Sequence, residues 1–331
     1  MRGLVDGFGR VHRDLRISLT DRCSLRCTYC MPADGVPWLQ KDSLLSTEEL
    51  VRLASVAVGL GVTEIRLTGG EPLLRPDVVD VVGRLASLTG PAGPVELSLT
   101  TNALRLPALA APLVDAGLRR VNISLDTLRR DRFLELTRRD RLVDTLAGIA
   151  AADAAGLSPI KINAVAMRGV NDDEIVDLTA YAADRGYQMR FIEQMPLDAG
   201  HTWDRASMVT REEILDALGD RWSLSPVDAD PHAPARLFSL DAGPATVGVI
   251  ASVTRPFCGT CDRIRLTADG QIRNCLFARE ESDLRALLRS GADDEALAAA
   301  MQAALRLKKA GHGIDDPGFL QPDRPMSAIG G

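Results

Sequence analysis

Stretches typical of β-strands alternate with amphipathic helical stretches along the first 200 residues, and this alternation limits the fold more than any other feature of the sequence. The predicted strands are Arg16–Thr20, Thr63–Thr68, Val95–Thr100, Arg120–Leu125, Ile160–Ala166 and Gln188–Gln194. The clearest helical segments are Thr47–Leu60, Arg141–Ala155 and Asp173–Arg185. Such strand-then-helix units predict an α/β protein with a parallel sheet covered by helices. A complete barrel has eight units and we recognise six, so we expect an incomplete (β/α)6 barrel of the TIM type.

Within these strands, apolar residues alternate with polar or charged ones more regularly than in a strand that is buried on both faces. Arg66 stands between Ile65 and Leu67, and the same order recurs around Lys161. If helices cover the apolar face, the polar face lines a lumen that is wide enough for a ligand; the alternative is a two-layer sheet with one face in water. We favour the lumen because basic residues recur on the polar face.

The pattern changes after residue 196, and we expect two regions: the partial barrel at residues 1–200 and a C-terminal extension at residues 201–331. The extension is predicted to contain a Pro/Asp-rich loop at Pro226–Pro234, a strand at Ala245–Thr254, a hairpin within Cys258–Cys275 and two helices within Asp283–Leu307. The second helix has acidic residues at its start and lysines at its end, as the helix dipole favours. The last nine residues, DRPMSAIGG, are small and are expected to be flexible.

Acidic residues outnumber basic ones, 45 to 39, which gives a formal net charge of -6. This balance argues against general binding to nucleic acid or to an anionic membrane, and an anionic substrate would need a local cluster of cations. The N-terminal sequence lacks the apolar run of a signal peptide, and no stretch is long enough to span a membrane. We therefore expect a cytoplasmic protein, in which clustered cysteines bind metal or do chemistry more often than they form disulfides.

Three of the six cysteines, Cys23, Cys27 and Cys30, follow the first predicted strand with the spacing C-x3-C-x2-C. The spacing also fits one face of a helix with buried structural thiols, but the surrounding residues are polar. Zinc sites usually have four ligands, and no histidine lies nearby. Thiolates suit iron–sulfur clusters. Three thiolates hold three irons of a cubane and leave the fourth iron open to another ligand.

The other three cysteines, Cys258, Cys261 and Cys275, have the spacing C-x2-C-x13-C. A redox pair and an incomplete zinc ribbon are alternatives, but a redox pair normally lies near a βαβ unit and the ribbon lacks a fourth ligand. Three thiols again favour a cubane with one open iron. The four histidines are scattered along the chain and we assign none of them a role; they are His12, His201, His232 and His312.

A hairpin lies between the cysteines of the second group, with a three-residue loop at Ala268–Gly270. A type I turn followed by glycine in the left-handed region fits this loop. The predicted cross-strand pairs are Thr267 with Gln271, Arg265 with Arg273 and Arg263 with Cys275. Paired residues share a face, so arginines would lie beside the third cysteine. A two-residue Asp-Gly turn would reverse this relation.

The first cysteine group, with Tyr29 before its last cysteine, resembles the signature of the radical S-adenosylmethionine (SAM) superfamily. In that superfamily SAM chelates the open iron, and one electron cleaves its sulfonium to give a 5′-deoxyadenosyl radical. The sequence Gly69-Gly70-Glu71-Pro72 follows a predicted strand and resembles the superfamily's methionine-binding loop, although alone it also fits an ordinary turn. The resemblance implies that SAM is bound by Tyr29, Gly69, Gly70, Glu71, Ser124 and Met195.

The two cysteine groups, the glycine-rich loop and the terminal Gly330-Gly331 together resemble the GTP 3′,8-cyclase family, which opens molybdenum cofactor biosynthesis. In that family the adenosyl radical removes hydrogen from C3′ of GTP, and C3′ then attacks C8 to give (8S)-3′,8-cyclo-7,8-dihydroguanosine 5′-triphosphate. The resemblance implies a guanine held at the second cluster and a glycine tail, Gly330 and Gly331, inside the active site. The GTP-binding residues it implies are Arg16, Arg66, Thr100, Lys161, Arg190, Arg263, Ile264 and Arg265.

The resemblance implies two 4Fe–4S clusters with three cysteine ligands each, and SAM as co-substrate. It also implies an external electron donor of the flavodoxin or ferredoxin type and transfer of the product to cyclic pyranopterin monophosphate synthase. Family members are often homodimers. Two alternatives remain: another radical SAM enzyme with an auxiliary cluster, such as a peptide-modifying enzyme, and a zinc-binding module without catalysis.

Overall fold

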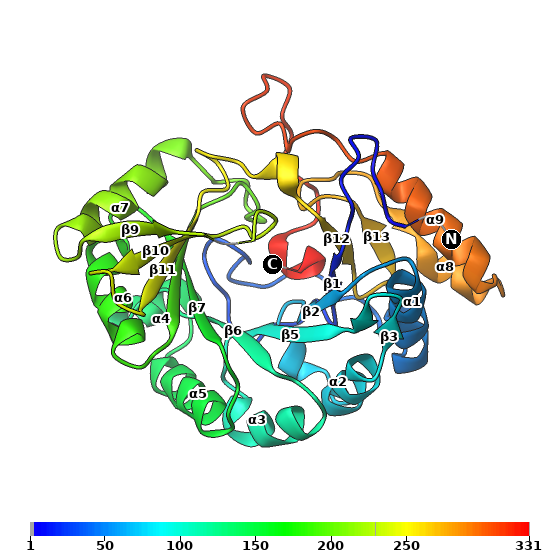
Figure 1. The fold of residues 1–331 in the computed structure, drawn as a ribbon, viewed down its shortest axis with the longest axis horizontal. Helices are drawn as coiled ribbons and strands as arrows, with labels where there is room; N and C mark the ends of the chain where they lie inside the picture. The colour runs from blue at the N-terminus through cyan, green and yellow to red at the C-terminus, as the bar shows by residue number, and fades with distance from the viewer. Residues whose placement is uncertain (1–2, 229, 331) are drawn as a thin grey trace.

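The computed structural model describes residues 3–228 and 230–330, and within them twelve strands join in one curved sheet (Figure 1). Eight neighbouring strands run parallel, in the order β12 (Arg263–Leu266), β1 (Asp14–Ser18), β2 (Glu64–Thr68), β5 (Glu96–Thr101), β6 (Arg120–Ser124), β7 (Ile160–Ala166), β8 (Gln188–Glu193) and β11 (Thr246–Ile250). Antiparallel strands continue the sheet: β13 (Gln271–Arg273) and β14 (Ser282–Asp283) beyond β12, and β10 (Arg236–Leu240) and β9 (Leu224–Val227) beyond β11. A separate pair is formed by β3 (Thr89–Gly90) and β4 (Gly93–Pro94).

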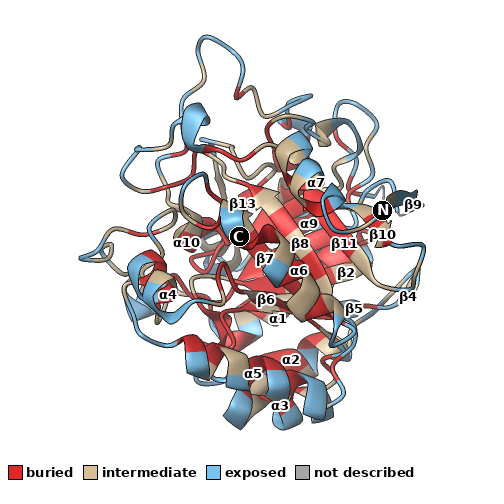
Figure 2. Cartoon of the chain, turned by 90° about the vertical axis from the view of Figure 1, so that its left-hand side faces the viewer, coloured by how far each residue is buried: buried red, intermediate tan, exposed pale blue. Residues whose placement is uncertain are grey.

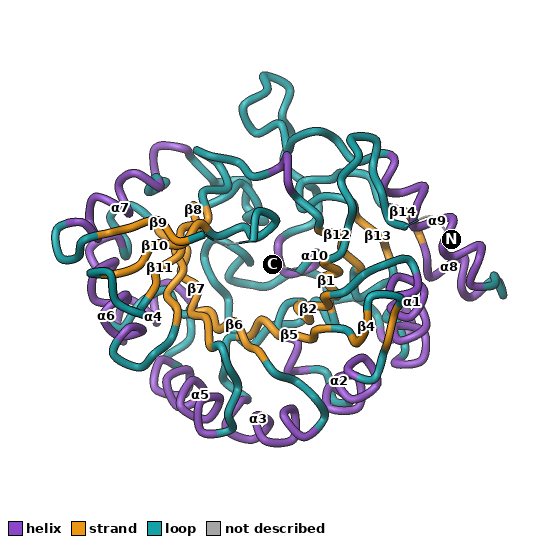
Figure 3. The backbone as a smooth tube through the Cα atoms, viewed as in Figure 1, coloured by secondary structure: helices purple, strands orange, loops and turns teal. Residues whose placement is uncertain are grey.

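Apart from α10 (Met326–Ile329), the helices cover the outside of this curved sheet, as the purple outer ring in Figure 3 shows. The α-helices are α1 (Thr47–Gly59), α2 (Val78–Ala86), α3 (Leu106–Asp115), α4 (Arg130–Thr137), α5 (Leu142–Ala154), α6 (Ile175–Ala183), α7 (Arg211–Gly219), α8 (Leu284–Arg289), α9 (Asp294–Arg306) and α10 (Met326–Ile329). Short 3-10 turns lie at η1 (Lys41–Ser43), η2 (Pro72–Leu74), η3 (Asp172–Glu174), η4 (Arg205–Ser207) and η5 (Cys258–Thr260). None of the helices in the described ranges is both long and apolar enough to cross a membrane.

Local sequence signals fix where several helices begin. Ser46 and Glu49 form a capping box at the start of α1, in which each side chain bonds the other's backbone N–H. At α9 the Asp293 carboxylate accepts a hydrogen bond from the Ala296 N–H, as the acidic start of this segment predicts. These caps satisfy backbone donors that would otherwise have no partner.

The strands have one apolar face and one polar face, as their alternation predicts. In β7, Ile160 and Ile162 are buried against the helices, whereas Lys161 and Asn163 are partly exposed and face the inside of the ring. Figure 2 shows the strands as a largely buried layer beneath helices whose outer faces are exposed. The fold is therefore the expected incomplete barrel with a polar lumen.

The C-terminal region extends this incomplete barrel at both edges, which the sequence does not predict. β12 pairs with β1 and β11 pairs with β8, so strands from the end of the chain extend both edges of the six-stranded core. The division into regions 1–200 and 201–331 remains a prediction. One expectation was wrong: Pro226, assigned to a loop, lies in β9, where an edge strand accommodates proline.

The hairpin has the predicted register. Arg265 pairs with Arg273, and the Thr267 N–H donates to the Gln271 carbonyl at 2.9 Å. Gly270 has a φ of 77° at the end of the three-residue loop, a value that glycine adopts without strain. The alternative two-residue turn is thereby excluded.

Candidate active site

A cavity of about 310 Å³ occupies the lumen of the barrel, and all six cysteines line it. Cys23, Cys27 and Cys30 come from the loop after β1. Cys258 and Cys261 flank the turn η5 just before β12, and Cys275 follows β13. Cysteine groups from the two ends of the chain therefore meet in one chamber because β12 lies beside β1. The first group lies at the carboxyl ends of the parallel strands, where barrels of this type build their sites, whereas the second group lies at the amino end of β12.

The first cysteine loop is held by backbone hydrogen bonds to the C-terminal end of α4. The N–H groups of Arg26 and Thr28 each donate to carbonyls of Thr137 and Leu136 at 2.9 Å. The Arg138 guanidinium donates to the Arg26 carbonyl at 2.7 Å. The path of the loop is thus fixed independently of anything that its thiols bind.

The two cysteine groups differ in their electrostatic surroundings. Burial, together with Glu71, raises the pKa of Cys23 to about 11, and burial raises that of Cys30 to about 12. Burial also opposes ionisation of Cys261, but Arg263 and Lys308 lower its pKa to about 7. Metal ligands must be thiolates, and a metal group supplies the positive charge that buried thiolates need. Three cavity-lining thiols in each group therefore fit iron–sulfur ligation by the chemistry of the donors.

The Gly69-Gly70 loop packs directly on the backbone that leads into the first cysteine group. The N–H groups of Gly70 and Glu71 donate to carbonyls of Thr20 and Arg22, both at 2.7 Å. A Cβ added at Gly70 would lie 2.5 Å from the Asp21 carbonyl oxygen and closer still to that of Arg22. Gly69 has a φ of 141°. Glycine is required here because two loops approach each other backbone to backbone.

The Glu71 carboxylate, expected to contact SAM, lines the cavity but is already occupied by local hydrogen bonds. It accepts from the Leu73 N–H at 3.0 Å, the Asn102 N–H at 2.8 Å and the Thr101 hydroxyl at 2.7 Å. Burial raises its pKa, and these donors oppose the rise. Glu71 thus joins the glycine loop to the end of β5, and a role toward SAM stays a prediction.

The other residues implied for SAM, Tyr29, Ser124 and Met195, also line the cavity. The Tyr29 hydroxyl donates to Asp126 Oδ2 at 2.8 Å, and Asp126 Oδ1 accepts from the Val165 N–H at 2.9 Å. Burial raises the pKa of Asp126 to about 6. Asp126 was not among the predicted site residues, although its position just after a polar-faced strand was a usable signal.

Five arginines expected to bind GTP line the cavity together with Thr100: Arg16, Arg66, Arg190, Arg263 and Arg265. They repel one another. Burial, followed by the charge of Arg66, lowers the pKa of both Arg16 and Arg190, to about 10 for Arg190. Among the described residues Arg16 Nε has no hydrogen-bond partner, and it lies 3.7 Å from the Asp14 carboxylate, beyond hydrogen-bonding distance. A buried, incompletely paired cation cluster is costly unless an anion binds it.

Two of the residues expected to bind GTP are outside the cavity lining. Lys161 lies one strand away from Arg190, and burial, with the charge of Arg190, lowers its pKa to about 7. Ile264 is 1% exposed and its side chain belongs to the hydrophobic core. Adjacent strand residues point to opposite faces, so only the backbone of Ile264 accompanies Arg263 and Arg265. Their roles stay predictions.

The C-terminal tail enters the lumen, where α10 lies at the centre of the ring in Figure 1. Met326 and Ser327 line the cavity, and the Arg265 guanidinium donates to the Gly330 carbonyl. A Cβ added at Gly330 would lie 2.5 Å from the Ser18 hydroxyl. The expectation of a flexible tail was wrong for residues 326–330, because they are fixed in the lumen. Gly331 lies outside the described residues.

His312 also lines the cavity, although no motif in the sequence points to it. Its Nε2 lies 3.0 Å from the Ser252 carbonyl, and its ring centroid is 5.4 Å from that of Phe277. A single histidine far from both cysteine groups in sequence carries no motif, so only the fold reveals its place.

A partial barrel with three cysteines after its first strand and a glycine-rich loop after its second defines a radical SAM protein. The Radical SAM superfamily model matches residues 17–182, and the Molybdenum Cofactor Synthesis C model matches residues 187–314. Among solved structures, Streptococcus suis SuiB has a TM-score of 0.61 at 14% identity, covering 96% of this chain and 77% of SuiB. This likeness concerns the fold alone.

Curated relatives identify the family more narrowly. The GTP 3′,8-cyclase of Streptomyces coelicolor is 58% identical over 99% of this chain and 96% of its own length. GTP 3′,8-cyclase 2 of Mycobacterium tuberculosis (strain H37Rv) is 56% identical over 99% of this chain and 92% of its own length. The chain belongs to the GTP 3′,8-cyclase family.

Proposed function

We propose that this chain is the radical SAM enzyme that cyclises GTP to (8S)-3′,8-cyclo-7,8-dihydroguanosine 5′-triphosphate, the first step of molybdenum cofactor biosynthesis. The observation that carries the proposal is that both cysteine groups and a cluster of buried and half-buried arginines line one cavity. A triphosphate requires several cations, which an acidic chain must concentrate at one place. The relatives named GTP 3′,8-cyclase match nearly the whole chain.

As a member of the radical SAM superfamily, the chain binds a 4Fe–4S cluster and SAM. Cys23, Cys27 and Cys30 would hold this cluster, and the glycine loop would receive the methionyl end of SAM through its backbone. When bound, the cluster and SAM supply a 5′-deoxyadenosyl radical that removes a hydrogen atom from C3′ of GTP. Tyr29, Ser124 and Met195, which line the same cavity, would orient SAM.

Cys258, Cys261 and Cys275 would hold a second 4Fe–4S cluster that leaves one iron for the guanine base. Arg263 and Arg265 lie beside this group on β12, and Arg16 and Arg66 lie on the two next strands in register with Arg265. Their guanidinium groups would bind the phosphates and hold the sugar between the two cysteine groups. Thr100, Lys161 and Arg190 would extend this binding surface along the polar strand faces, with the backbone of Ile264.

The tail would complete the site. Gly330 and Gly331 would lie against the substrate, with Arg265 held between the tail and the phosphates. Because a side chain at position 330 would collide with the hydroxyls of Ser18 and Thr68, the tail can enter only as glycine. A tail seated in the lumen would exclude water from the reacting carbon.

The decisive experiment is anaerobic incubation of the reconstituted protein with GTP, SAM and a strong reductant, followed by mass analysis of the nucleotide. Alanine at Cys23, Cys27 or Cys30 should abolish 5′-deoxyadenosine. Alanine at Cys275 should retain 5′-deoxyadenosine formation and lose the cyclised nucleotide. A Cys275→Ala protein that cyclises GTP at the normal rate would contradict the role given to the second cluster.

The alternatives give different results in the same preparation. Zinc without iron and sulfide would support the zinc-binding module, and uptake of a peptide substrate in place of GTP would support a peptide-modifying enzyme. We propose in addition a cytoplasmic location, reduction by a flavodoxin or ferredoxin, and hand-off of the product to cyclic pyranopterin monophosphate synthase. A size measurement of the purified protein would test the proposed homodimer.

A further inference from the structure

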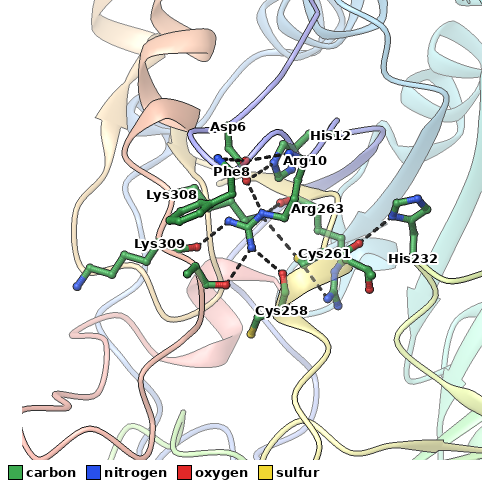
Figure 4. Close-up of polar contacts among 12 residues, drawn as sticks. Asp6, Phe8, Arg10, His12, His232, Cys258, Cys261, Arg263, Lys308 and Lys309 are labelled. Atoms are coloured by element: carbon green, nitrogen blue, oxygen red, sulfur yellow. Dashed lines mark hydrogen bonds and ion pairs between the residues drawn. The ribbon is translucent and has the colours of Figure 1, made fainter.

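The N-terminal segment, residues 4–12, lies across the second cysteine group, as Figure 4 shows. It is a tight loop organised by the Asp6 carboxylate. This carboxylate accepts from the N–H groups of Phe8 at 2.9 Å and Arg10 at 3.0 Å, and from Arg10 Nε at 2.5 Å. The ring of His12, fully buried, lies 3.2 Å from the same carboxylate. The Arg10 guanidinium is thereby held in a fixed position.

Arg10 joins two other segments of the chain. Its Nη1 donates to the carbonyls of Cys258 at 2.6 Å and Ala310 at 3.0 Å, and its Nη2 donates to the Lys309 carbonyl at 2.7 Å. One guanidinium therefore ties the backbone of a cysteine in the second group to the residues that follow α9. We call this arrangement of Asp6 and Arg10 the N-terminal clamp.

The clamp fixes the chain next to Lys308, which is 6% exposed. Lys308 Nζ donates to the Arg263 carbonyl at 2.9 Å and to Cys261 Sγ at 3.5 Å (Figure 4). Arg263 Nη2 donates to the same sulfur at 3.3 Å. Cys261 thus has two cationic donors on its sulfur, whereas Cys23 Sγ in the first group has two neutral ones, the Leu25 N–H at 3.4 Å and Asn102 Nδ2 at 3.9 Å.

Donors to a ligand sulfur withdraw negative charge from it and stabilise the reduced form of an iron–sulfur cluster. Lys308 is buried without being part of the GTP-binding set, and its Nζ lies at a sulfur instead of in solvent. We propose that Lys308 is a positioning residue of the second cysteine group: its ammonium raises the reduction potential of the group bound there, and the N-terminal clamp holds Lys308 at Cys261. This inference rests on the second cluster of the proposed function.

A purely structural role is the competing explanation, because Lys308 also bonds the Arg263 carbonyl at the start of β12. Lysine to methionine removes both bonds and the charge while keeping the length of the side chain. Lys309→Met is the matched control: it removes the same charge one residue away, from a side chain that is exposed. Lys308→Arg restores a cationic donor.

The experiment is a redox titration of the full-length, reconstituted protein followed by electron paramagnetic resonance. The component that disappears in Cys275→Ala is assigned to the second cluster. In Lys308→Met its reduction equilibrium should shift at least tenfold toward the oxidised form, which is about 59 mV for one electron. The reduction potential of the first cluster should not change in Lys308→Met, and neither potential should change in Lys309→Met. Lys308→Arg should restore most of the potential of the second cluster.

The result distinguishes this inference from the proposed function. Wild-type protein with iron for only one cluster would contradict the second cluster itself. Two intact clusters with the same potentials in Lys308→Met and Lys309→Met would overturn the inference alone. If Lys308→Met loses the second cluster, Arg10→Met is used instead, because it releases the clamp without replacing Lys308 or Arg263, the two donors to Cys261. Arg10→Met should lower the reduction potential of the second cluster. An unchanged potential in Arg10→Met would also overturn the inference.

Discussion

The substitution Gly70→Ala tests how the glycine loop positions the first cysteine group. The added Cβ would lie 2.5 Å from the Asp21 carbonyl oxygen, about 0.9 Å short of the 3.4 Å at which ordinary van der Waals contact begins. The obstructing atoms belong to the backbone, so no side-chain rotation relieves the collision. The two loops must separate, and the two 2.7 Å backbone hydrogen bonds between them must lengthen.

The expected cost follows from these contacts. Overpacking costs about 1–3 kcal/mol, and each lost hydrogen bond costs about 0.5–1.5 kcal/mol. Gly70→Ala should therefore lower the free energy of unfolding by about 2–6 kcal/mol. Because the displaced backbone leads directly into Cys23, iron retention should fall as well. Gly59→Ala is the control, since Gly59 lies at the end of α1 with open space around its Cα.

The assay combines a thermal melt with iron and sulfide analysis after anaerobic reconstitution. Gly59→Ala should leave stability within about 1 kcal/mol of the parent, because alanine favours a helix. If Gly70→Ala has the same melting temperature as Gly59→Ala and retains as much iron, this loop does not fix the cysteine backbone.

Three further predictions concern the lumen. Lys161, with a pKa of about 7, should become protonated when a triphosphate binds. Calorimetry at pH 8 in buffers of different ionisation enthalpy should therefore show proton uptake on binding, and Lys161→Met should abolish this uptake. Arg324→Ala removes the pair with Asp269 at 2.8–2.9 Å and should expose the tail to carboxypeptidase and reduce product yield, whereas Arg279→Ala, which breaks an exposed pair at 3.4 Å, should change neither. Burial raises the pKa of Asp126 to about 6, so the folded state favours the protonated form of this side chain. The stability of the wild-type protein should therefore fall relative to that of Asp126→Asn as the pH rises from 4 to 7. A difference in melting temperature that stays constant over this pH range would contradict the prediction.

Much of the barrel could be predicted because local signals agree with it. β7 begins and ends at the predicted residues, since every second residue from Ile160 onward is buried. β1 begins at Asp14, two residues before the predicted start. Asp14 joins the sheet because it pairs with both Glu64 and Arg263, and such long-range pairing leaves no mark in the local sequence.

The site was predictable where spacing carries chemistry and was not where the fold alone brings residues together. Cysteine spacing and the hairpin loop led to the two cysteine groups that line the cavity and to the register of Arg265 with Arg273. His312 and Lys308 were missed, because each reaches the site through contacts with segments distant in sequence, whereas Asp126 was missed although its position after β6 was a usable signal. The order of residues 326–330 was also missed, since it depends on Arg265 and on space between Ser18 and Thr68.

The N-terminal clamp has a consequence for how the protein is made. Arg10 bonds a carbonyl that lies 248 residues further along the chain. At a synthesis rate of 5–20 residues per second, this partner leaves the ribosome roughly 10–50 s after Arg10. During that interval the edge of β1 in the nascent chain is unpaired, and an unpaired strand edge promotes aggregation. Expression at reduced temperature or with added chaperones should therefore increase the yield of folded protein more than any change at the chain's surface.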